Sequence, residues 1–400
     1  MDRPPVYTGA GARYILRRNI MREAVIVDAV RSAGGRSRRG GLASTRPDEF
    51  GIQVLKGLLA RHPQLNPKDI DDVIAGCAFP EGDQGMQIGR VLAVGAGLPE
   101  HVAGMTINRL CASGVQAIAD ATAKISMGWS DVIIAGGVES MSHIPMGGSI
   151  LRPNFDWPAD LPWVYISMGL TAENIAANYK IPREDMDAMG MESNRRAYEA
   201  IKAGKFKEEI IPINAYKYKI DKRGNYVRET FVFDTDDGVR WPVTLEEMAK
   251  LKSPFKAGGN VTAANSSQTT DGAAFALLMT AEKAKATGLK PLAKLTHHAV
   301  VGVKPEEMGV GPRYAIPKVL EQAGLKTKDI DVFEINEAFA SQALYSIREI
   351  GIEDRLKAGD INPNGGAIAL GHPLGASGAK LTAQLLHEMK RRGSKRGIVS

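Results

Sequence analysis

The sequence is poor in cysteine and lacks a long apolar run. It has two cysteines among 400 residues, too few for a disulfide framework, which favours a reducing compartment and a cytoplasmic location. No stretch approaches the roughly 18 consecutive apolar residues of a membrane span, so no span is expected. The chain is 44% hydrophobic and 24% charged, a composition that excludes disorder and indicates a globular protein of two or more packed units.

Two common binding patterns are also missing. There is no glycine-rich mononucleotide loop ending in Lys-Ser or Lys-Thr. No cluster of metal ligands is evident either, because the adjacent His297 and His298 would point to opposite faces of a strand. We therefore expect neither this kind of nucleotide site nor a bound metal.

The positive charge of the chain is concentrated near its ends. The net charge is +6, and residues 1–22 hold five arginines against one aspartate. A second basic cluster lies near the end of a helix predicted at 376–393, where cations complement the helix dipole. No recognition motif or interleaved aromatic residues accompany either cluster, so nucleic-acid binding is not expected. Residues 1–21 are interpreted as a flexible extension; an organelle transit peptide is the alternative.

An internal duplication organises the chain. Lys-Asp-Ile-Asp occurs at 68–71 and again at 328–331, each time before a strand-like run. Ala-Ser-Gly occurs at 112–114 and again at 376–378, each time opening a predicted helix. Strands that alternate with helices of about 15 residues indicate parallel α/β layers. The sequence therefore predicts an α/β protein made of two related halves packed through their helices.

The duplication sets the expected domain boundaries. The stretch between the two parts of the first half is punctuated by Gly and Pro and predicts a loop-rich lid, with helices at 171–179 and 183–203. The expected parts are an extension at 1–21, an N-terminal half at 22–141 plus 255–290, a loop domain at 142–254 and a C-terminal half at 291–400.

Cys111 is the candidate nucleophile. It lies in a turn of small and polar residues, 108–114, that leads into a predicted helix. A thiol at the first turn of a helix is close to unpaired backbone N–H groups and to the positive end of the dipole, and both favour the thiolate. Cys77 lies in an apolar run and is interpreted as a core residue.

His372 and Asn336 are the candidate partners of this thiol. His372 precedes the second Ala-Ser-Gly triplet, so the duplication is expected to bring it to the pocket of Cys111, where it would act as the base. Asn336 ends an apolar strand predicted within 332–339, at an edge where ligands gather in α/β sheets. It could stabilise an oxyanion directly or through a water, or it could cap the following helix.

Four segments together resemble the thiolase family: 108–116, 136–142, 336–340 and 365–378. The match runs in order from about residue 22 to residue 400. It implies a duplicated five-layered α/β/α/β/α fold, a homodimer or homotetramer, and acyl-CoA and CoA as substrates with no permanently bound cofactor.

The resemblance also implies residue roles. Cys111 would take the acyl group from a 3-ketoacyl-CoA, His372 would activate the thiol and help to hold the thioester oxygen, and Asn336 would position an oxyanion-hole water. The residues that match the family's CoA-contacting regions are Met168, Arg240, Phe255, Ala263, Ser267, Ala338 and Phe339. Arg240 suits a phosphate or adenine because its donors are planar.

Two features bear on the exact activity. Ser167 stands where some short-chain members carry histidine, which favours a general 3-ketoacyl-CoA thiolase. The family's second cysteine, in a Cys-x-Gly turn after the final strand, is not in this sequence, which stops at Ser400 inside a strand predicted from residue 397. We therefore expect a truncated sequence that is acylated at Cys111 but fails in the carbon–carbon bond step.

The leading hypothesis is a thiolase of fatty-acid β-oxidation. It would split 3-ketoacyl-CoA with CoA into acetyl-CoA and a shortened acyl-CoA through a cysteine thioester, with another enzyme of fatty-acid oxidation as a possible partner. The alternatives are a thiolase-like protein that binds acyl-CoA without turnover and a short-chain acetoacetyl-CoA thiolase.

Overall fold

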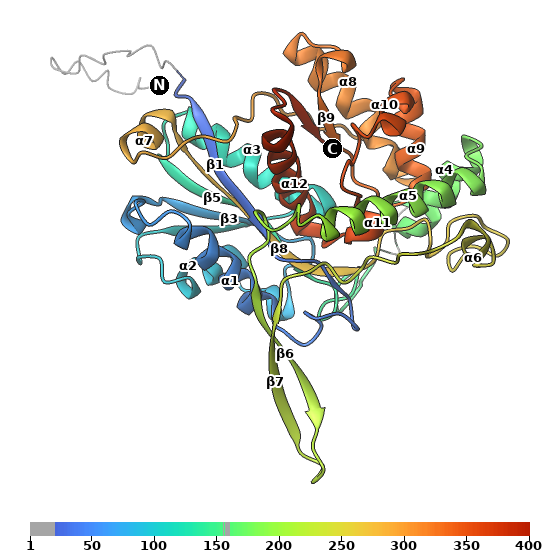
Figure 1. Cartoon of the computed structure of the whole chain (residues 1–400), viewed down its shortest axis with the longest axis horizontal. Coiled ribbons are helices and arrows are strands. Elements are labelled where there is room, and N and C mark those ends of the chain that lie inside the picture. The colour runs from blue at the N-terminus through green and yellow to red at the C-terminus, as the bar shows by residue number, and fades with distance from the viewer. Residues whose placement is uncertain (1–20, 155, 157–160) are drawn as a thin grey trace, which may run out of the picture.

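In the computed structural model, the body of the protein has a six-stranded sheet and a two-stranded sheet that are separated and flanked by helices, and a further two-stranded hairpin lies outside them (Figure 1). The structure describes residues 21–154, 156 and 161–400; the predicted extension lies outside the described residues except for its last residue. The strands are β1 (Ala24–Arg31), β2 (Gly35–Arg36), β3 (Asp72–Gly76), β4 (Ala103–Ile107), β5 (Val132–Ser140), β6 (Ile213–Ile220), β7 (Tyr226–Phe233), β8 (Thr270–Thr280), β9 (Val332–Glu334) and β10 (Gly397–Val399).

The helices surround these sheets and also lie between them. In the described part of the chain, none has the length and apolar character of a membrane span. The α-helices are α1 (Pro47–Ala60), α2 (Ile88–Gly95), α3 (Ser113–Ser126), α4 (Met168–Asn178), α5 (Arg183–Lys202), α6 (Leu245–Ala249), α7 (Ala281–Ala286), α8 (Gly311–Ala323), α9 (Ala340–Glu349), α10 (Glu353–Ala358), α11 (Ala367–Leu370) and α12 (Ser377–Arg392).

The larger sheet has the strand order β1-β8-β5-β3-β4, and β2 adds to β8. β3 is parallel to β4 and β5, whereas β8 is antiparallel to β1 and β5. Four of its strands, β1, β3, β5 and β8, are buried along their whole length, because α1 and α2 cover one face and α3 and α12 cover the other. Such two-sided burial explains why these strands read as nearly continuous apolar runs.

Helices α3 and α12 form the central layer. A Cβ on Gly114 would come within 2.7 Å of the Ala379 nitrogen, and one on Gly378 would come closer still to the Val115 nitrogen. The two glycines therefore let the two helix starts touch backbone to backbone. Beyond α12 lies the smaller sheet of β9 and β10, and α8 and α9 pack on its outer side. The predicted duplicated α/β fold with five layers is confirmed.

The smaller sheet corrects one prediction. β9 ends at Glu334, whereas a strand reaching toward residue 339 was expected. At Ile335 the Asn362 side chain takes the place of a neighbouring backbone: it accepts from the Ile335 nitrogen and donates to the Ile335 oxygen, both at 2.8 Å. On the other edge the Asn336 nitrogen still donates to the Ser400 oxygen at 2.8 Å, and after this residue the chain turns toward α9.

The segment at 142–254 contains more regular structure than a loop-rich lid. Helices α4 and α5 occupy the two stretches predicted to be helical. The antiparallel hairpin of β6 and β7, which was not predicted, projects well away from the body (Figure 1). Its alternating Tyr-Lys-Tyr-Lys pattern at 216–219 was a signal for a strand. The domain boundaries themselves stay a prediction.

Candidate active site

The two turns related by the duplication meet at one place. Cys111 lies in a 3-10 turn at Leu110–Ala112 that leads into α3, and His372 precedes the 3-10 turn Leu374–Ala376 that leads into α12. The two turns contact each other. Gly137 of β5 lies under them, so close that a Cβ there would clash with the Gly375 oxygen. The predicted convergence of the thiol turn and the imidazole turn is therefore found in the structure.

The environment of Cys111 differs from the expected one. The side chain is partly exposed and packs against Ala78, Met141 and Leu374. Burial, and after it the negative charge of Glu139, raise the pKa of the Cys111 thiol to about 12. Apolar packing and the nearby carboxylate thus act against the thiolate that the helix start was expected to favour. The thiol needs a base to release its proton.

Glu139 was not singled out in the sequence, yet it joins the two halves at the site. Its carboxylate accepts from the Ala78 nitrogen at 2.7 Å, from the Gly375 nitrogen at 2.8 Å and from Gln84 Nε2 at 2.6 Å. Its position in Gly-Gly-Val-Glu-Ser, at the end of an apolar strand, was the available signal. Burial raises the pKa of Glu139, although these donors act in the opposite direction.

His372 is buried and neutral. Burial, and after it the charge of Lys380, lower the pKa of the imidazole to about 3. The hydroxyl of Ser377 donates to the Pro373 oxygen at 3.0 Å and lies 2.5 Å from His372 Nδ1. A hydroxyl has one hydrogen; with that hydrogen on the Pro373 oxygen, Ser377 Oγ accepts from Nδ1–H. This is the tautomer that leaves Nε2 unprotonated, as a base requires.

Asn336 lies beside this imidazole. Its Nδ2 is 3.4 Å from His372 Nε2 and 3.5 Å from Nδ1. Its Oδ1 is buried and has no hydrogen-bond partner in the described part of the chain. The helix-capping alternative is wrong, because the N-cap of α9 is Phe339 and no side chain caps that helix. The amide is therefore available to a water or to a substrate oxygen.

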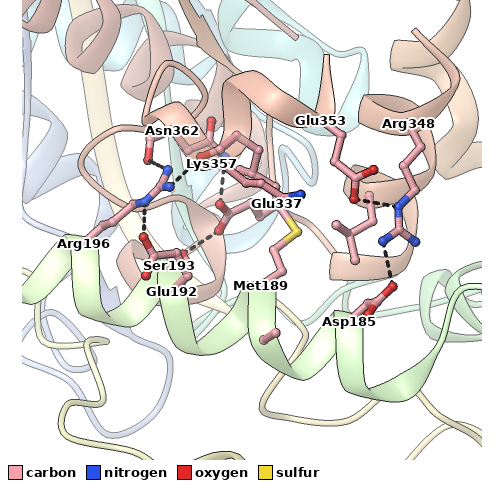
Figure 2. A pocket seen from close by; sticks show the side chains of 13 residues that line it. Asp185, Met189, Glu192, Ser193, Arg196, Glu337, Arg348, Glu353, Lys357 and Asn362 are labelled. Atoms are coloured by element: carbon pink, nitrogen blue, oxygen red, sulfur yellow. Dashed lines mark hydrogen bonds and ion pairs between the residues drawn. The ribbon is translucent and has the colours of Figure 1, made fainter. Parts of the chain in front are cut away.

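Glu337, the next residue, faces a different part of the molecule. Figure 2 shows it at the wall of a separate cavity of about 410 Å³ lined by residues of α5, α9 and α10. Its carboxylate accepts from Ser193 Oγ at 2.6 Å and from Asn362 Nδ2 at 2.8 Å. These adjacent residues thus have different roles. Asn336 lies beside the imidazole, and Glu337 bonds the segment after β9 to Ser193 of α5.

The residues predicted to contact CoA form one continuous strip. The rings of Phe255 and Phe339 meet edge to face with centroids 5.9 Å apart, and Gly169, next to Met168, packs so tightly on Phe255 that a Cβ there would clash with the ring. The Ser267 nitrogen donates to the Ala338 oxygen at 2.9 Å.

The strip leads to the imidazole at one end and to a cation at the other. Ser266 pairs with Phe339 and Thr269 pairs with His372, so four consecutive residues connect the aromatic pair to the base. Arg240 Nη2 donates to the Ala263 oxygen at 2.9 Å, and its side chain is partly exposed. The structure brings together all seven residues predicted to contact CoA.

Family comparisons identify the chain. Residues 24–282 match the N-terminal domain of thiolase and residues 289–400 match the C-terminal domain. The chain belongs to the thiolase family. A 3-ketoacyl-CoA thiolase of Bacillus subtilis (strain 168) is 48% identical over 380 residues, which cover 95% of this thiolase and 96% of the relative. The peroxisomal 3-ketoacyl-CoA thiolase 5 of Arabidopsis thaliana is 44% identical, with 94% and 82% covered.

A solved structure agrees with the fold of this thiolase. The crystal structure of Bacillus anthracis acetyl-CoA acetyltransferase superposes with a TM-score of 0.84 and 38% identity, covering 96% of each chain. The residues that sequence reasoning missed in this thiolase, Glu139 and Ser377, are both buried and hold the two turns rather than line an open pocket. Ser377 had a signal, because it belongs to the repeated Ala-Ser-Gly triplet.

Proposed function

We propose that this thiolase cleaves 3-ketoacyl-CoA with free CoA into acetyl-CoA and a shortened acyl-CoA, using Cys111 as nucleophile, His372 as base and Asn336 as oxyanion stabiliser. The carrying observation is that the turns of Cys111 and His372 touch, with the Asn336 amide beside the imidazole. The bacterial and plant relatives named as 3-ketoacyl-CoA thiolases, similar over nearly the whole chain, support the same reaction.

The protonation states fit this division of labour. The Cys111 thiol holds its proton at neutral pH, and the neutral Nε2 of His372 takes it as sulfur attacks the 3-keto carbon. The C2–C3 bond then breaks, its electron pair and the proton that His372 took from Cys111 go to C2 of the departing acetyl-CoA, and the acyl group stays on Cys111. The family's second cysteine, expected to exchange this proton, is not in this sequence, so His372 is the proton donor in this scheme. The sulfur of free CoA then attacks the thioester as His372 takes the CoA thiol proton, and the Cys111 sulfur receives that proton as the shortened acyl-CoA leaves. Asn336 stabilises the oxygen anion in these steps, directly or through a water.

The strip from Arg240 to Phe339 would hold the CoA substrate, and no permanently bound cofactor is required. The Phe255 side chain is 37% exposed and so offers an apolar face to the pantetheine arm. Arg240, which has no ion-pair partner among the described residues, would receive a phosphate. The acyl chain length that the site prefers would follow from kinetics across ketoacyl-CoA lengths, which would also separate this activity from that of a short-chain acetoacetyl-CoA thiolase.

A homodimer or homotetramer would place the nucleophile turn at a subunit contact. β4 is an outer strand of the larger sheet and is partly exposed along most of its length. Near it in sequence, Leu110 is 53% exposed and Met86 is 91% exposed. An open strand edge with exposed apolar side chains favours pairing with a second copy. A cytoplasmic location and a partner enzyme of fatty-acid oxidation stay predictions; the named plant relative is peroxisomal.

Acylation of the protein by acetyl-CoA tests the nucleophile directly. Intact-mass analysis after incubation should show one acetyl adduct, absent from C111A and retained by the matched variant C77A. Burial raises the pKa of Cys77 as well, and its thiol lies inside the core, so C77A should leave the adduct intact. An adduct that persists in C111A would remove Cys111 from the mechanism. No adduct in the unaltered protein would favour an acyl-CoA-binding protein without turnover.

A further inference from the structure

The hairpin of β6 and β7 extends away from the body of the protein (Figure 1). Its strands are buried only near their base, where Ile213, Ala215 and Phe233 pack into the body. Farther out, residues 217–220 and 226–230 are all exposed. A hairpin of two strands without a covering layer is marginally stable in water. The outer end of this hairpin therefore offers a surface that another surface could cover.

Large apolar side chains gather at this outer end. Ile220 pairs with Tyr226, the last pair before the turn, and Tyr218 pairs with Arg228 two positions farther in. The two pairs lie on the same face, because side chains alternate along a strand. Tyr226 is 77% exposed, Ile220 66% and Tyr218 56%. A group of exposed apolar side chains of this kind is typical of a contact with a partner or a membrane.

The outer end is also positively charged. The hairpin contains three lysines and two arginines against two carboxylates. Glu229 pairs with Lys219 at 2.6 Å, and Asp221 helps to close the turn by accepting from the Arg223 nitrogen at 2.8 Å. Lys222 and the guanidinium of Arg223, both in the turn, form no ion pair with any described residue. Unpaired cations thus lie next to the apolar pair, which favours an anionic partner.

The charge and the size of this end distinguish between the possible partners. A second copy of the chain would bring two equally charged hairpin ends together, which opposes their contact. A protein interface of standard size takes about 800 Å² and roughly 20–30 residues from each side, more residues than the outer hairpin contains. A nucleic acid would bind the cations but leave the apolar pair uncovered. A membrane with anionic headgroups suits both, because apolar side chains enter its interface while cations stay at the headgroups.

We propose that the outer end of the β6–β7 hairpin is a docking site for an anionic membrane surface. Ile220 and Tyr226 enter the interfacial region, and Lys222 and Arg223 bind the headgroups. The consequence for catalysis rests on the proposed function. A long acyl chain partitions from water into a lipid surface, so docking would bring the protein to 3-ketoacyl-CoA substrates with long chains.

Vesicle flotation tests the docking site without reference to catalysis. The unaltered protein should bind vesicles of phosphatidylglycerol and phosphatidylcholine, and its binding to phosphatidylcholine alone should be weaker by about tenfold or more. I220S/Y226S keeps the cations, and K222Q/R223Q keeps the apolar pair. Each double variant should lower binding to the anionic vesicles by on the order of tenfold, because both kinds of contact contribute.

Matched controls change the same kinds of side chain outside the hairpin. W129S removes an apolar side chain that is 72% exposed after α3. K250Q/K252Q removes two exposed lysines at the end of α6 and just beyond it. Both should bind the anionic vesicles as the unaltered protein does. All four variants should form the acetyl adduct at Cys111 at the unaltered rate when no vesicles are present.

The other outcomes contradict the proposal in distinct ways. It is overturned if the unaltered protein does not bind anionic vesicles, or if the hairpin variants and the controls bind equally. If I220S/Y226S changes the oligomeric state in analytical ultracentrifugation and leaves vesicle binding intact, the hairpin end is a contact between copies and the proposal is wrong. Binding to a DNA duplex without binding to vesicles would also overturn it. A protein that binds the vesicles but forms no acetyl adduct would refute the proposed function and leave the docking site standing.

Discussion

Ser113 and Ser377 occupy equivalent positions in the two halves, and their hydroxyls have different partners. Ser113 Oγ donates to the Leu110 oxygen at 2.6 Å and accepts from the Arg109 nitrogen at 2.9 Å. Ser377 Oγ donates to the Pro373 oxygen at 3.0 Å, but its second partner is the imidazole. Ser113 therefore binds only backbone groups, whereas Ser377 binds a backbone oxygen and the imidazole of His372. The duplication thus supplies the turn, and local divergence supplies the chemistry.

The helices that follow these two turns, α3 and α12, differ in how much of their surface is buried. α12 is buried along its first twelve residues because it lies between the two sheets, whereas α3 has a partly exposed face. The His372 imidazole therefore lies on the more buried side of the site. Asn108, Arg109 and Leu110, on the thiol side, are exposed.

Loss of the His372 imidazole should give the largest effect on the acetylation rate. A small effect would contradict the view that the second half supplies the base. In H372Q the single-turnover acetylation of Cys111 by acetyl-CoA should slow by about 10³-fold, since the thiol then has no base. H387Q is the matched control: His387 is also buried, on helix α12 that follows the His372 turn, and its ring binds the Ala29 oxygen at 3.0 Å away from the site. Equal slowing in both variants would indicate general damage to α12.

The contact between the two helix starts should be sensitive to single methyl groups. G378A and G114A each place a Cβ against backbone nitrogen of the facing helix, and G378A makes the closer contact. We expect G378A to lower the free energy of unfolding in urea by about 3 kcal/mol and G114A by about 2 kcal/mol. Gly302 has no atom within 4 Å of an added Cβ, so G302A should change it by less than about 0.5 kcal/mol. Equal stability of all three would contradict the close packing of the two halves.

Local pattern and duplication together predicted the α/β scaffold and the meeting of the Cys111 and His372 turns, because each turn and element is marked by its own stretch of sequence. Three features were missed, and two of them depended on distant residues. The Asn362 side chain, rather than a backbone, pairs with Ile335 after β9. Glu139 and burial in an apolar cluster raise the pKa of the Cys111 thiol. The projecting hairpin was hidden because its Gly and Pro flanks suggested a loop. The CoA strip was located only through the family resemblance, since its segments lie far apart along the chain.

Removing each hydroxyl sharpens the comparison of the two serines. S377A frees the imidazole to change tautomer and should slow Cys111 acetylation about tenfold with little change in stability. S113A removes a brace of the thiol turn, and we expect the free energy of unfolding to fall by about 1 kcal/mol with a smaller change in rate. The acetylation rate and the free energy of unfolding in urea are measured for both variants, so that each serine is assigned either an effect on rate or an effect on stability. The opposite pattern would mean that Ser377 is a backbone brace like its counterpart.

The smallest expected effect concerns the charge that the first half places near its own thiol. In E139Q the negative charge disappears, so the pKa of Cys111 should fall and alkylation by iodoacetamide at pH 8 should quicken about two- to fivefold. The measurement uses a C77A background, so that Cys111 alone reacts. E100Q, which removes an exposed carboxylate, should leave the rate unchanged.

The E139Q variant should also unfold more easily, since an amide cannot accept from both Ala78 and Gly375 and also from Gln84. A faster thiol in a less stable protein would show that Glu139 joins the halves at the expense of thiolate formation. A slower thiol would show instead that its hydrogen bonds, rather than its charge, control Cys111.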